Sequence, residues 1–503
     1  MRRKVETIVL KAQRIADQIS AERSAFRVVA HYDADGITSA AIFVQALLRE
    51  NKNFKLSFVK QLNEDILKEI AEENFNMFIF LDMGSGQLDN IREYIPDNKN
   101  VIICDHHQIQ GEKGKNMLHL NPIENGIEDN VSGAGITYLV ARALNSENKC
   151  LSELAIVGAV GDSQIGSIGS EWGLFGLNKE MLKDAGECKK IRIEKGLRLW
   201  GRYTRPVHKA LEYSVDPFIP NVSGSESASV QFLQEMGIRL KNEKGNWRVL
   251  EDLSEEEQKK LASGIIAERI KNGEDNAEWI FGDNYELLDK GKFRDASEFA
   301  TLLNSTGKLK KAYLGLSLCM NDMSPMDEVK STLETYRRDI AKGMEWLSKN
   351  KSIIRTTKNA HYILAGDRIS EHIISNVTSI FYRSGVVPKL PTFAFVKAED
   401  GNIKMSARSD EDNVNLQEIV SQASKEVGGE GGGHKGASGA TIPAGKEETF
   451  INCIEKIMES KDINDTKQDN TLEEEDDRGK EDRREEGSEE TVERKGLVQY
   501  LGS

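Results

Sequence analysis

The first 165 residues alternate short apolar runs with amphipathic segments, and this alternation constrains the fold more than any other feature of the chain. Three apolar runs end in polar residues: FRVVAH at 26–31, MFIFLD at 77–82 and VIICDH at 101–106. Segments with helical spacing of apolar residues lie at 4–20 and 37–49. Buried strands that alternate with helices predict a parallel α/β sheet. In such sheets ligands bind beyond the carboxyl ends of the strands, and here those ends are polar.

Histidine and aspartate gather in four short segments at these strand ends and in loops. The segments are His31-Tyr32-Asp33-Ala34-Asp35-Gly36, Asp82 in FLDMGSG, Asp105-His106-His107 in VIICDHHQ, and Asp162 in GAVGDSQ. Each segment alone is more often structural, because aspartate at a strand end is a common helix N-cap. The ordered set instead predicts a metal site, since carboxylates suit Mg²⁺ and Mn²⁺ and imidazole shifts the preference toward Mn²⁺. Several such ligands can hold two cations about 3.5–4 Å apart, which activate water and orient a phosphate.

The chain has 503 residues, too many for one hydrophobic core, so we expect two to four domains. The alternating pattern fills residues 1–190. Residues 200–345 change to charged helical segments and are expected to be an inserted domain, mostly helical or α+β. Strand patterns return over 350–460, in HYILAG, VVPKLPTFAFV and NIKMSARS. Residues 461–503 begin with a stretch poor in apolar residues and rich in acidic ones, which predicts a disordered tail that ends in the peptide GLVQYLGS.

Two motifs in the last of these domains are candidates for holding a phosphate-bearing substrate. The segment GGEGGGHKGASGA at 428–440 is expected to be a glycine-dense loop whose backbone N–H groups form an anion nest. In the strand pattern KMSARS, alternate side chains face one side and can grip a nucleic-acid backbone. A flexible linker and a solvated edge strand are the structural alternatives. The candidate substrate-binding residues are Lys404, Ser406, Arg408, Gly432, Gly433 and His434.

The ordered metal motifs and the segment GGGHKGASGA together resemble the DHH phosphoesterase superfamily, named for the motif seen here as Asp105-His106-His107. The resemblance covers about 1–170 and 350–450. Within the superfamily it is to archaeal RecJ-like exonucleases, which include the GINS-associated nuclease. It implies a parallel-sheet DHH catalytic domain and a smaller α/β DHH-associated, nucleic-acid-binding C-terminal domain. The metal ligands that it implies are His31, Asp33, Asp35, Asp82, His106 and Asp162.

The resemblance also implies individual roles. Asp82 and Asp162 would bridge the two cations, His107 would contact the scissile phosphate, and Asp105 would orient the histidine pair. For three further motifs, a functional and a structural interpretation both remain open. SGAG at 132–135 aids phosphate binding or caps a helix, His119 and Asn121 in HLNP lie near the site or stabilise a loop, and LLNSTGK at 302–308 contacts a nucleotide or ends a helix.

From this resemblance we expect a divalent-metal-dependent exonuclease on single-stranded DNA or RNA, acting in replication or repair, with two cations and Mn²⁺ preferred over Mg²⁺. By the same resemblance, residues 200–345 are placed to be an insertion that docks GINS and the replicative helicase, although an insertion there could equally narrow the substrate channel. Two alternatives remain. One is a small-substrate phosphoesterase that cleaves short oligonucleotides or cyclic dinucleotides, and the other is a replication scaffold. The intact metal motifs argue against a purely structural role.

The net charge of −14 first argues against a nucleic-acid partner, because binding is driven largely by phosphate neutralisation. Residues 461–495, however, carry fifteen acidic and eight basic residues, which accounts for −7. Residues 351–460 are near balance, with thirteen basic and fourteen acidic residues. We therefore expect phosphate contact through metal ions and only a narrow basic track.

The five cysteines lie far apart and form no C-x-x-C pair, so neither a disulfide framework nor a thiolate zinc site is expected. No apolar run approaches the roughly 20 residues that span a bilayer, and the basic start lacks the apolar stretch of a signal peptide. These features predict a cytoplasmic protein without a membrane partner.

Overall fold

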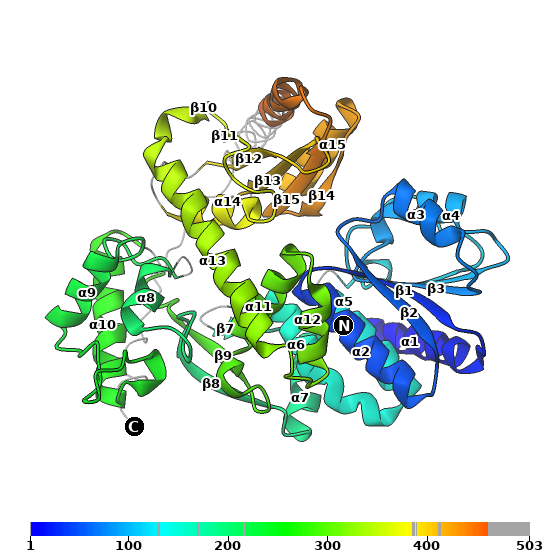
Figure 1. Ribbon diagram of the computed structural model, residues 1–503, viewed down its shortest axis with the longest axis horizontal. Coiled ribbons are helices and arrows are strands. Elements are labelled where there is room, and N and C mark those ends of the chain that lie inside the picture. The colour runs from blue at the N-terminus through cyan, green and yellow to red at the C-terminus, as the bar shows by residue number, and fades with distance from the viewer. Residues whose placement is uncertain are drawn as a thin grey trace, which may run out of the picture.

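The structure is a computed structural model that describes residues 2–127, 131–168, 171–214, 217–274, 276–384, 388, 390–410 and 414–460. The tail predicted at 461–503 lies outside the described residues, as do residues 386, 387 and 389 of the segment VVPKLPTFAFV. Figure 1 shows a first domain on the right and in the centre, a lobe with α8, α9 and α10 on the left, and an upper domain that holds β10 to β15.

A five-stranded parallel sheet forms the centre of the first domain. The strands are β1 Phe26–His31, β2 Phe54–Val59, β3 Met77–Leu81, β4 Asn100–Cys104 and β5 Met117–Leu120. Their spatial order is β2-β1-β3-β4-β5, and every neighbouring pair is parallel. The predicted strands at 26–31, 77–82 and 101–106 correspond to β1, β3 and β4, so the predicted parallel α/β sheet is confirmed. The carboxyl ends of all five strands lie at one edge of the sheet.

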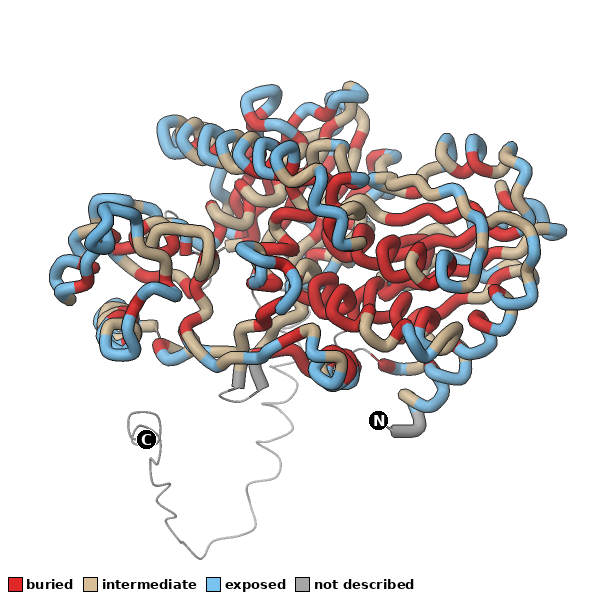
Figure 2. Tube along the Cα trace, turned by 60° about the horizontal axis from the view of Figure 1, so that its bottom comes forward, coloured by how far each residue is buried: buried red, intermediate tan, exposed pale blue. Residues whose placement is uncertain are grey.

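Helices cover both faces of this sheet. Val28, Ile79 and Ile102 point toward the face that packs on α1, α2, α5 and α6, whereas Val29 and Phe80 point toward α3 and α4. Because both faces are covered, β1, β3 and β4 are buried along most of their length (Figure 2), and their sequences are continuous apolar runs. The helices are α1 Arg2–Ala21, α2 Ala34–Arg49, α3 Glu64–Ala71, α4 Leu88–Tyr94, α5 Gly133–Leu144, α6 Ser152–Gly161 and α7 Asn178–Glu187. A short hairpin of β6 Gly166–Ile168 and β7 Glu171–Gly173 lies between α6 and α7.

The segment expected to be one insertion, 200–345, divides in two. Its first part has a core of its own, built from residues such as Leu211, Leu233 and Ile265. The chain enters and leaves this part through a pair of antiparallel strands. Its second part joins the core of the first domain through Phe299 and Leu303, because the apolar face of α11 packs on α6. The elements are β8 Ile191–Leu197, α8 Val207–Glu212, α9 Glu226–Glu235, α10 Glu255–Lys271, β9 Phe281–Leu287, α11 Ala296–Lys308 and α12 Ala312–Cys319.

The long helix α13 (Met326–Lys349) connects the first domain to the upper, C-terminal domain (Figure 1). This domain holds a six-stranded mixed sheet in the order β10-β11-β12-β13-β15-β14, in which β11 and β12 pair in parallel and the other neighbours antiparallel. One face of the sheet packs on α15 and on a helix over 447–460, and the other on α13 and α14. The elements are β10 Ile354–Thr356, β11 His361–Gly366, α14 Ile374–Arg383, β12 Thr392–Lys397, β13 Ile403–Arg408, α15 Leu416–Glu426, β14 Glu430–His434 and β15 Ala437–Ile442.

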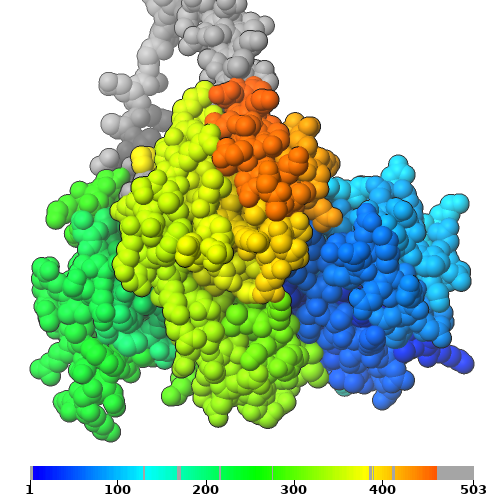
Figure 3. Space-filling model, turned by 45° about the horizontal axis from the view of Figure 1, so that its top comes forward, coloured from blue at the N-terminus to red at the C-terminus, as the bar shows by residue number. Residues whose placement is uncertain are grey.

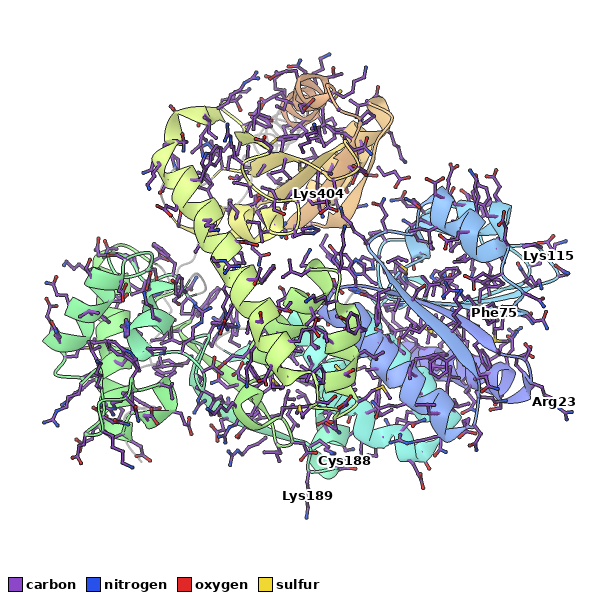
Figure 4. All side chains as sticks on the ribbon, viewed as in Figure 1. Arg23, Phe75, Lys115, Cys188, Lys189 and Lys404 are labelled. Atoms are coloured by element: carbon purple, nitrogen blue, oxygen red, sulfur yellow. A yellow bond between two sulfur atoms is a disulfide. The ribbon has the colours of Figure 1, made fainter. Side chains whose placement is uncertain are left out.

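A disulfide joins Cys150 to Cys188, and Figure 4 labels Cys188. The sequence predicted no disulfide framework, and it did not indicate this single bond. The two residues are 38 positions apart in the sequence, but Cys150 lies just before α6 and Cys188 just after α7, and the packing of these two helices brings the Cα atoms to 5.4 Å. Within the described ranges, the other three cysteines are free. Among the described residues we also find no helix long and apolar enough to cross a membrane.

Candidate metal centre

The polar residues predicted at strand ends meet at the carboxyl edge of the parallel sheet. His31 ends β1, Asp82 follows β3 directly, and Asp105 follows β4, and these three strands are neighbours. Asp162 comes from the other layer, as the residue that caps the C-terminus of α6. Asp82 has a backbone φ of +58°, a left-handed conformation that aspartate tolerates better than most residues and that turns the chain at the strand end.

The first group of ligand atoms lies at the end of β1. Nδ1 of His31 is 3.0 Å from Oδ1 of Asp33 and 3.5 Å from Oδ2 of Asp82. Ligand atoms of these three residues lie within 4.8 Å of one another, which is close enough for all of them to bind one cation.

The second group surrounds the ring of His106. Its Nε2 is 3.5 Å from Oδ1 of Asp82, 3.7 Å from Oδ2 of Asp35 and 3.7 Å from Oδ2 of Asp162. Asp82 therefore turns one carboxylate oxygen toward each group. Such an arrangement can hold two cations with one shared carboxylate between them.

Atoms without hydrogen-bond partners mark where a cation fits. Within the part of the chain that the structure describes, Oδ1 of Asp82 and Nε2 of His106 are buried and make no hydrogen bond, although they lie 3.5 Å apart. Buried polar atoms are normally satisfied, because an unsatisfied one costs about 1–3 kcal/mol. A carboxylate oxygen and an imidazole nitrogen are both good ligands for Mn²⁺ or Mg²⁺, so the residues present fit a divalent cation.

Asp35 is held by the N-terminus of α5. Its two oxygens accept hydrogen bonds from the backbone N–H groups of Gly133 (2.7 Å) and Ala134 (2.9 Å). This contact decides between the two interpretations of SGAG: Ser132 caps α5, and the helix N-terminus binds the carboxylate of Asp35. A Cβ atom at Gly133 would come 2.5 Å from Oδ1 of Asp82, so glycine is needed there for the carboxylates to approach the helix.

Asp105 is fully buried and accepts four hydrogen bonds. They come from the backbone N–H groups of Ser85 (2.8 Å), His106 (2.8 Å) and His107 (3.2 Å), and from Nδ1 of His107 (2.7 Å). The positively charged histidines and the Ser85 N–H outweigh burial and hold the pKa of Asp105 well below its usual range. Asp105 is thus an ionised carboxylate that fixes the orientation of the DHH segment.

A second layer of polar contacts lies behind Asp105. Oγ of Ser85 is 2.8 Å from Nε2 of His119, whose Nδ1 is 2.9 Å from Glu124. The side-chain amide of Asn121 donates to Oγ of Ser85 and to the carbonyl oxygen of His107. His119 and Asn121 therefore stabilise the loops that carry the site.

Negative charge dominates the electrostatics of the centre. Burial and the neighbouring carboxylates of Asp82 and Asp162 raise the pKa of Asp35 well above its ordinary value. Burial alone would lower the pKa of His31 and His106, but the surrounding aspartates raise both well above the ordinary value. Without a cation, protons must balance the carboxylates, so binding of a cation would release protons.

The motif LLNSTGK supports the metal-binding turn from α11, a role that the sequence alone left open. Oδ1 of Asn304 accepts a hydrogen bond from the backbone N–H of Ala34 (2.9 Å), at the start of α2. Nζ of Lys308 donates to the hydroxyl of Tyr32 (3.0 Å). The motif thus ends a helix and holds the H-Y-D-A-D-G turn in place through these hydrogen bonds. Lys308 and Tyr32 both line the cleft beside the candidate metal centre.

A cleft of about 600 Å³ opens between the first and the C-terminal domain, next to these residues. Figure 3 shows the C-terminal domain seated against the first domain, coloured blue, and Figure 4 shows Lys404 at the boundary. Lys404, Ser406 and Arg408 all line the cleft from β13, as the alternation predicted. Ser406 is buried, and Arg408 donates to Oγ of Ser379 (2.7 Å). Burial and the nearby charges of Lys308 and Lys60 lower the pKa of Lys404 to about 8.

The glycine-dense segment at 428–440 is a β-hairpin and not a loop. Gly432 and Gly433 lie in the edge strand β14 and pair with Gly439 and Ser438 of β15, and both line the cleft. The expectation of a loop failed because the absence of side chains lets these backbones pack closely: a Cβ atom at Gly433 would come 2.6 Å from the carbonyl oxygen of Ala437. The turn brings His434 to the metal centre, where its ring centroid is 5.6 Å from that of His106 and its Nε2 is 3.8 Å from Asp162.

Three family models match the chain. The DHH family N-terminal domain matches residues 25–161, the DHH-CID domain matches 199–279, and the DHHA1 domain matches 363–460. An uncharacterized protein of Methanocaldococcus jannaschii is 31% identical over 469 residues, which cover 91% of this chain and 99% of that protein. The single-stranded-DNA-specific exonuclease RecJ of Thermus thermophilus is 26% identical over 197 residues, 37% of this chain and 28% of that protein.

Solved structures share the fold at low sequence identity. The structure of RecJ in complex with Mn²⁺ from Thermus thermophilus superposes with a TM-score of 0.55 at 16% identity and covers 90% of this chain and 55% of that one. CDC45 from Entamoeba histolytica superposes with a TM-score of 0.60 at 12% identity and covers 90% of this chain and 98% of that one. The chain thus spans about half the length of the first of these structures and nearly all of the second.

Proposed function

Because this chain belongs to the DHH superfamily as a RecJ-like protein, we propose that it is a divalent-metal-dependent exonuclease that hydrolyses phosphodiester bonds of single-stranded DNA or RNA. Hydrolase activity follows from the family, and the choice of single strands rests on the cleft and on the resemblance to RecJ. Replication or repair is the process that we assign to it.

The observation that carries the proposal is the position of Asp82 between two groups of ligands. His31 and Asp33 lie on one side of its carboxylate, and His106 with Asp35 and Asp162 on the other. A purely structural cluster would pair its polar atoms, whereas here buried ligand atoms stay without hydrogen bonds. We assign two cations to these groups, with Mn²⁺ preferred because imidazole contributes to each.

When bound, the cations would polarise the phosphate and lower the pKa of a water molecule. The protein residues would then position the substrate. Asp105 fixes Nδ1 of His107, which leaves the other ring nitrogen of His107 to donate to the scissile phosphate. Burial and the charge of His106 lower the pKa of His107, but the carboxylate of Asp105 raises it more, so Asp105 favours the protonated ring as a donor.

The cleft supplies the remaining contacts to the strand. Lys404, Ser406 and Arg408 line its upper wall and would bind backbone phosphates, and the hairpin residues Gly432 and Gly433 let the backbone approach closely. His434, which belongs to the C-terminal domain, reaches the metal centre of the first domain. We therefore propose that the substrate is held by both domains at once.

We also propose that the lobe over 199–279 docks a protein partner, with GINS and the replicative helicase as the candidates. Its separate core, built around Leu233 and Ile265, and its exposed Trp247 are consistent with a surface that works independently of the cleft. Deletion of this lobe should abolish co-purification with GINS while the remaining chain still binds Mn²⁺. Unchanged co-purification would reject the docking role.

A digestion series with end-labelled substrates tests the proposed substrate class. Single-stranded DNA and RNA of about 20 nucleotides, the matching duplexes and a dinucleotide would be compared with Mn²⁺, Mg²⁺ and a chelator. We expect stepwise release of mononucleotides from single strands and little cleavage of duplexes. Turnover restricted to the dinucleotide would select a small-substrate phosphoesterase instead.

A further inference from the structure

Two arginines share one tryptophan ring at the base of the 199–279 lobe, away from the metal centre. Cζ of Arg205 lies 3.9 Å from the ring centroid of Trp200, and Cζ of Arg337 lies 5.1 Å from it. Arg205 also lies 4.8 Å from the ring of Tyr213, which is 49% exposed. Trp200 is fixed by a hydrogen bond from its Nε1 to Thr301 on α11 (3.1 Å).

Neither guanidinium is neutralised by an ion pair within the described residues. Nε of Arg337 is buried without a hydrogen-bond partner. Glu298, a buried carboxylate whose charge acts on both arginines, accepts from the backbone N–H of Tyr203 (3.1 Å) and from the hydroxyl of Thr204. Burial and Asp295 raise the pKa of Glu298 to about 7, so it carries only part of a negative charge at neutral pH.

Both guanidiniums lie within 5.1 Å of the centroid of the Trp200 ring, and the positive charge of each disfavours the charge of the other. Burial and the charge of Arg337 lower the pKa of Arg205 to about 9. An anion that contacts both groups would relieve this electrostatic repulsion and would accept the forked hydrogen bonds that guanidinium groups offer to phosphate. An exposed aromatic ring beside them can stack on a nucleic-acid base.

The cluster is connected to the cleft by two helices. Thr301, which holds Trp200, and Lys308, which lines the cleft, are seven residues apart on α11, about 10 Å along the helix. Arg337 on α13 follows Tyr336, whose hydroxyl donates to Asn376 of the C-terminal domain (2.6 Å). A strand that leaves the cleft therefore needs to extend only a few nucleotides to reach the cluster.

We propose that Trp200, Arg205, Tyr213 and Arg337 form a second phosphate-binding subsite that takes a nucleotide at a distance from the scissile bond. This inference rests on the proposed function, since the nucleotide belongs to the strand that occupies the cleft. The same residues would also bind a free nucleotide. The experiment therefore distinguishes a nucleotide of the strand in the cleft from a free nucleotide.

The experiment measures the affinity of internally labelled single strands of about 3 and about 15 nucleotides by fluorescence anisotropy, with a chelator present to prevent hydrolysis. The double variant Arg205→Gln/Arg337→Gln should weaken binding of the longer strand on the order of tenfold and leave the shorter strand unaffected. The slope of log Kd against log salt concentration should fall by about 0.7 for each phosphate that the variant no longer neutralises. Arg338→Gln is the matched control, because Arg338 is the exposed neighbour on the same helix, and it should leave both affinities unchanged.

A competing 5′-mononucleotide identifies the source of the ligand. If the mononucleotide does not compete, the ligand of the subsite is a nucleotide of the longer strand. If the mononucleotide weakens binding of the longer strand by wild type to the level of the double variant, the subsite takes free nucleotides. Equal affinity of wild type and double variant for both lengths, together with intact Mn²⁺-dependent hydrolysis, would overturn the subsite and leave the proposed function standing. Absence of hydrolysis by wild type would instead overturn the proposed function.

Melting temperatures distinguish a defect in binding from a defect in folding. If the double variant unfolds at a much lower temperature, the single variant Arg337→Gln replaces it, because Trp200 then keeps its closer arginine. A single variant with wild-type affinity and an unchanged salt slope would also overturn the subsite.

Discussion

Oδ1 of Asp105 lies 2.7 Å from Nδ1 of His107, and the same oxygen accepts the backbone N–H groups of His106 and His107. One buried carboxylate oxygen thus sets the backbone turn and the ring orientation of the two histidines. This relationship explains why aspartate precedes the histidine pair: it positions the backbone of His106 and the ring of His107.

The variant Asp105→Asn tests this positioning role. The amide keeps the shape but loses the negative charge that holds His107 protonated, so kcat should fall roughly 10- to 100-fold. The substrate KM should change little, because the cleft is intact. The pH at which kcat declines on the alkaline side should move downward, since the pKa of His107 loses its main upward contribution. A variant with wild-type kcat and pH profile would contradict the role of Asp105.

The variant Gly133→Ala tests the close approach of the carboxylates to α5. The added Cβ would meet Oδ1 of Asp82 at 2.5 Å, so Asp82 or the helix must move. We expect weaker Mn²⁺ affinity, measured by calorimetry, and a stability loss of about 1–3 kcal/mol from overpacking. Gly186→Ala on α7 is the control, because no heavy atom lies within 4 Å of its added Cβ, and it should keep the wild-type Mn²⁺ affinity.

The charge of Lys404 should control the pH dependence of substrate capture. Its pKa of about 8 means that it is charged below pH 8, where it would bind phosphate, and that it loses this charge as the pH rises above 8. The kcat/KM of wild type should therefore fall by up to about tenfold per pH unit above pH 8. In Lys404→Arg the decline should begin at a higher pH, because guanidinium stays protonated. Superimposable pH profiles of the two proteins would assign the decline to another group.

The disulfide between Cys150 and Cys188 should stabilise the part of the first domain that carries Asp162. Loop closure over 38 residues predicts a contribution of about 4 kcal/mol to the free energy of unfolding. Chemical denaturation of Cys150→Ser should show that the free energy of unfolding falls by about this amount. Reducing agent should lower the free energy of unfolding of wild type by the same amount. Cys453→Ser, which removes a free cysteine, is the control. Equal stability of oxidised and reduced wild type would show that the bond contributes nothing.

The sequence predicted the centre of the fold because burial leaves a clear pattern there. Strands covered on both faces read as unbroken apolar runs, and parallel strands place their carboxyl ends at one edge. His31, Asp82 and Asp105 could therefore be brought together from the pattern of strands alone. The roles of His31 and Asp82 as cation ligands, and of Asp105 as the residue that orients the histidines, stay predictions.

Other features depend on contacts that no local pattern encodes. Asn304 reaches Ala34 across 270 positions, and Cys150 meets Cys188 only after α6 and α7 pack. The glycines at 431–433 were expected to form a loop, but their missing side chains allow an edge strand to pack against its neighbour. The part of 200–345 that joins the first domain does so through Phe299 and Leu303 of α11, a packing that the charged helical pattern of the segment did not reveal.

The central claim is that Asp82 joins two cation groups that carry out hydrolysis. Its most direct test is turnover of a single-stranded oligonucleotide by wild type and Asp82→Asn, measured side by side in Mn²⁺ and in chelator. We predict Mn²⁺-dependent turnover by wild type, and a loss on the order of 10³-fold or more in a variant that remains folded by circular dichroism. Turnover by wild type in chelator, or wild-type activity of Asp82→Asn, would contradict the claim.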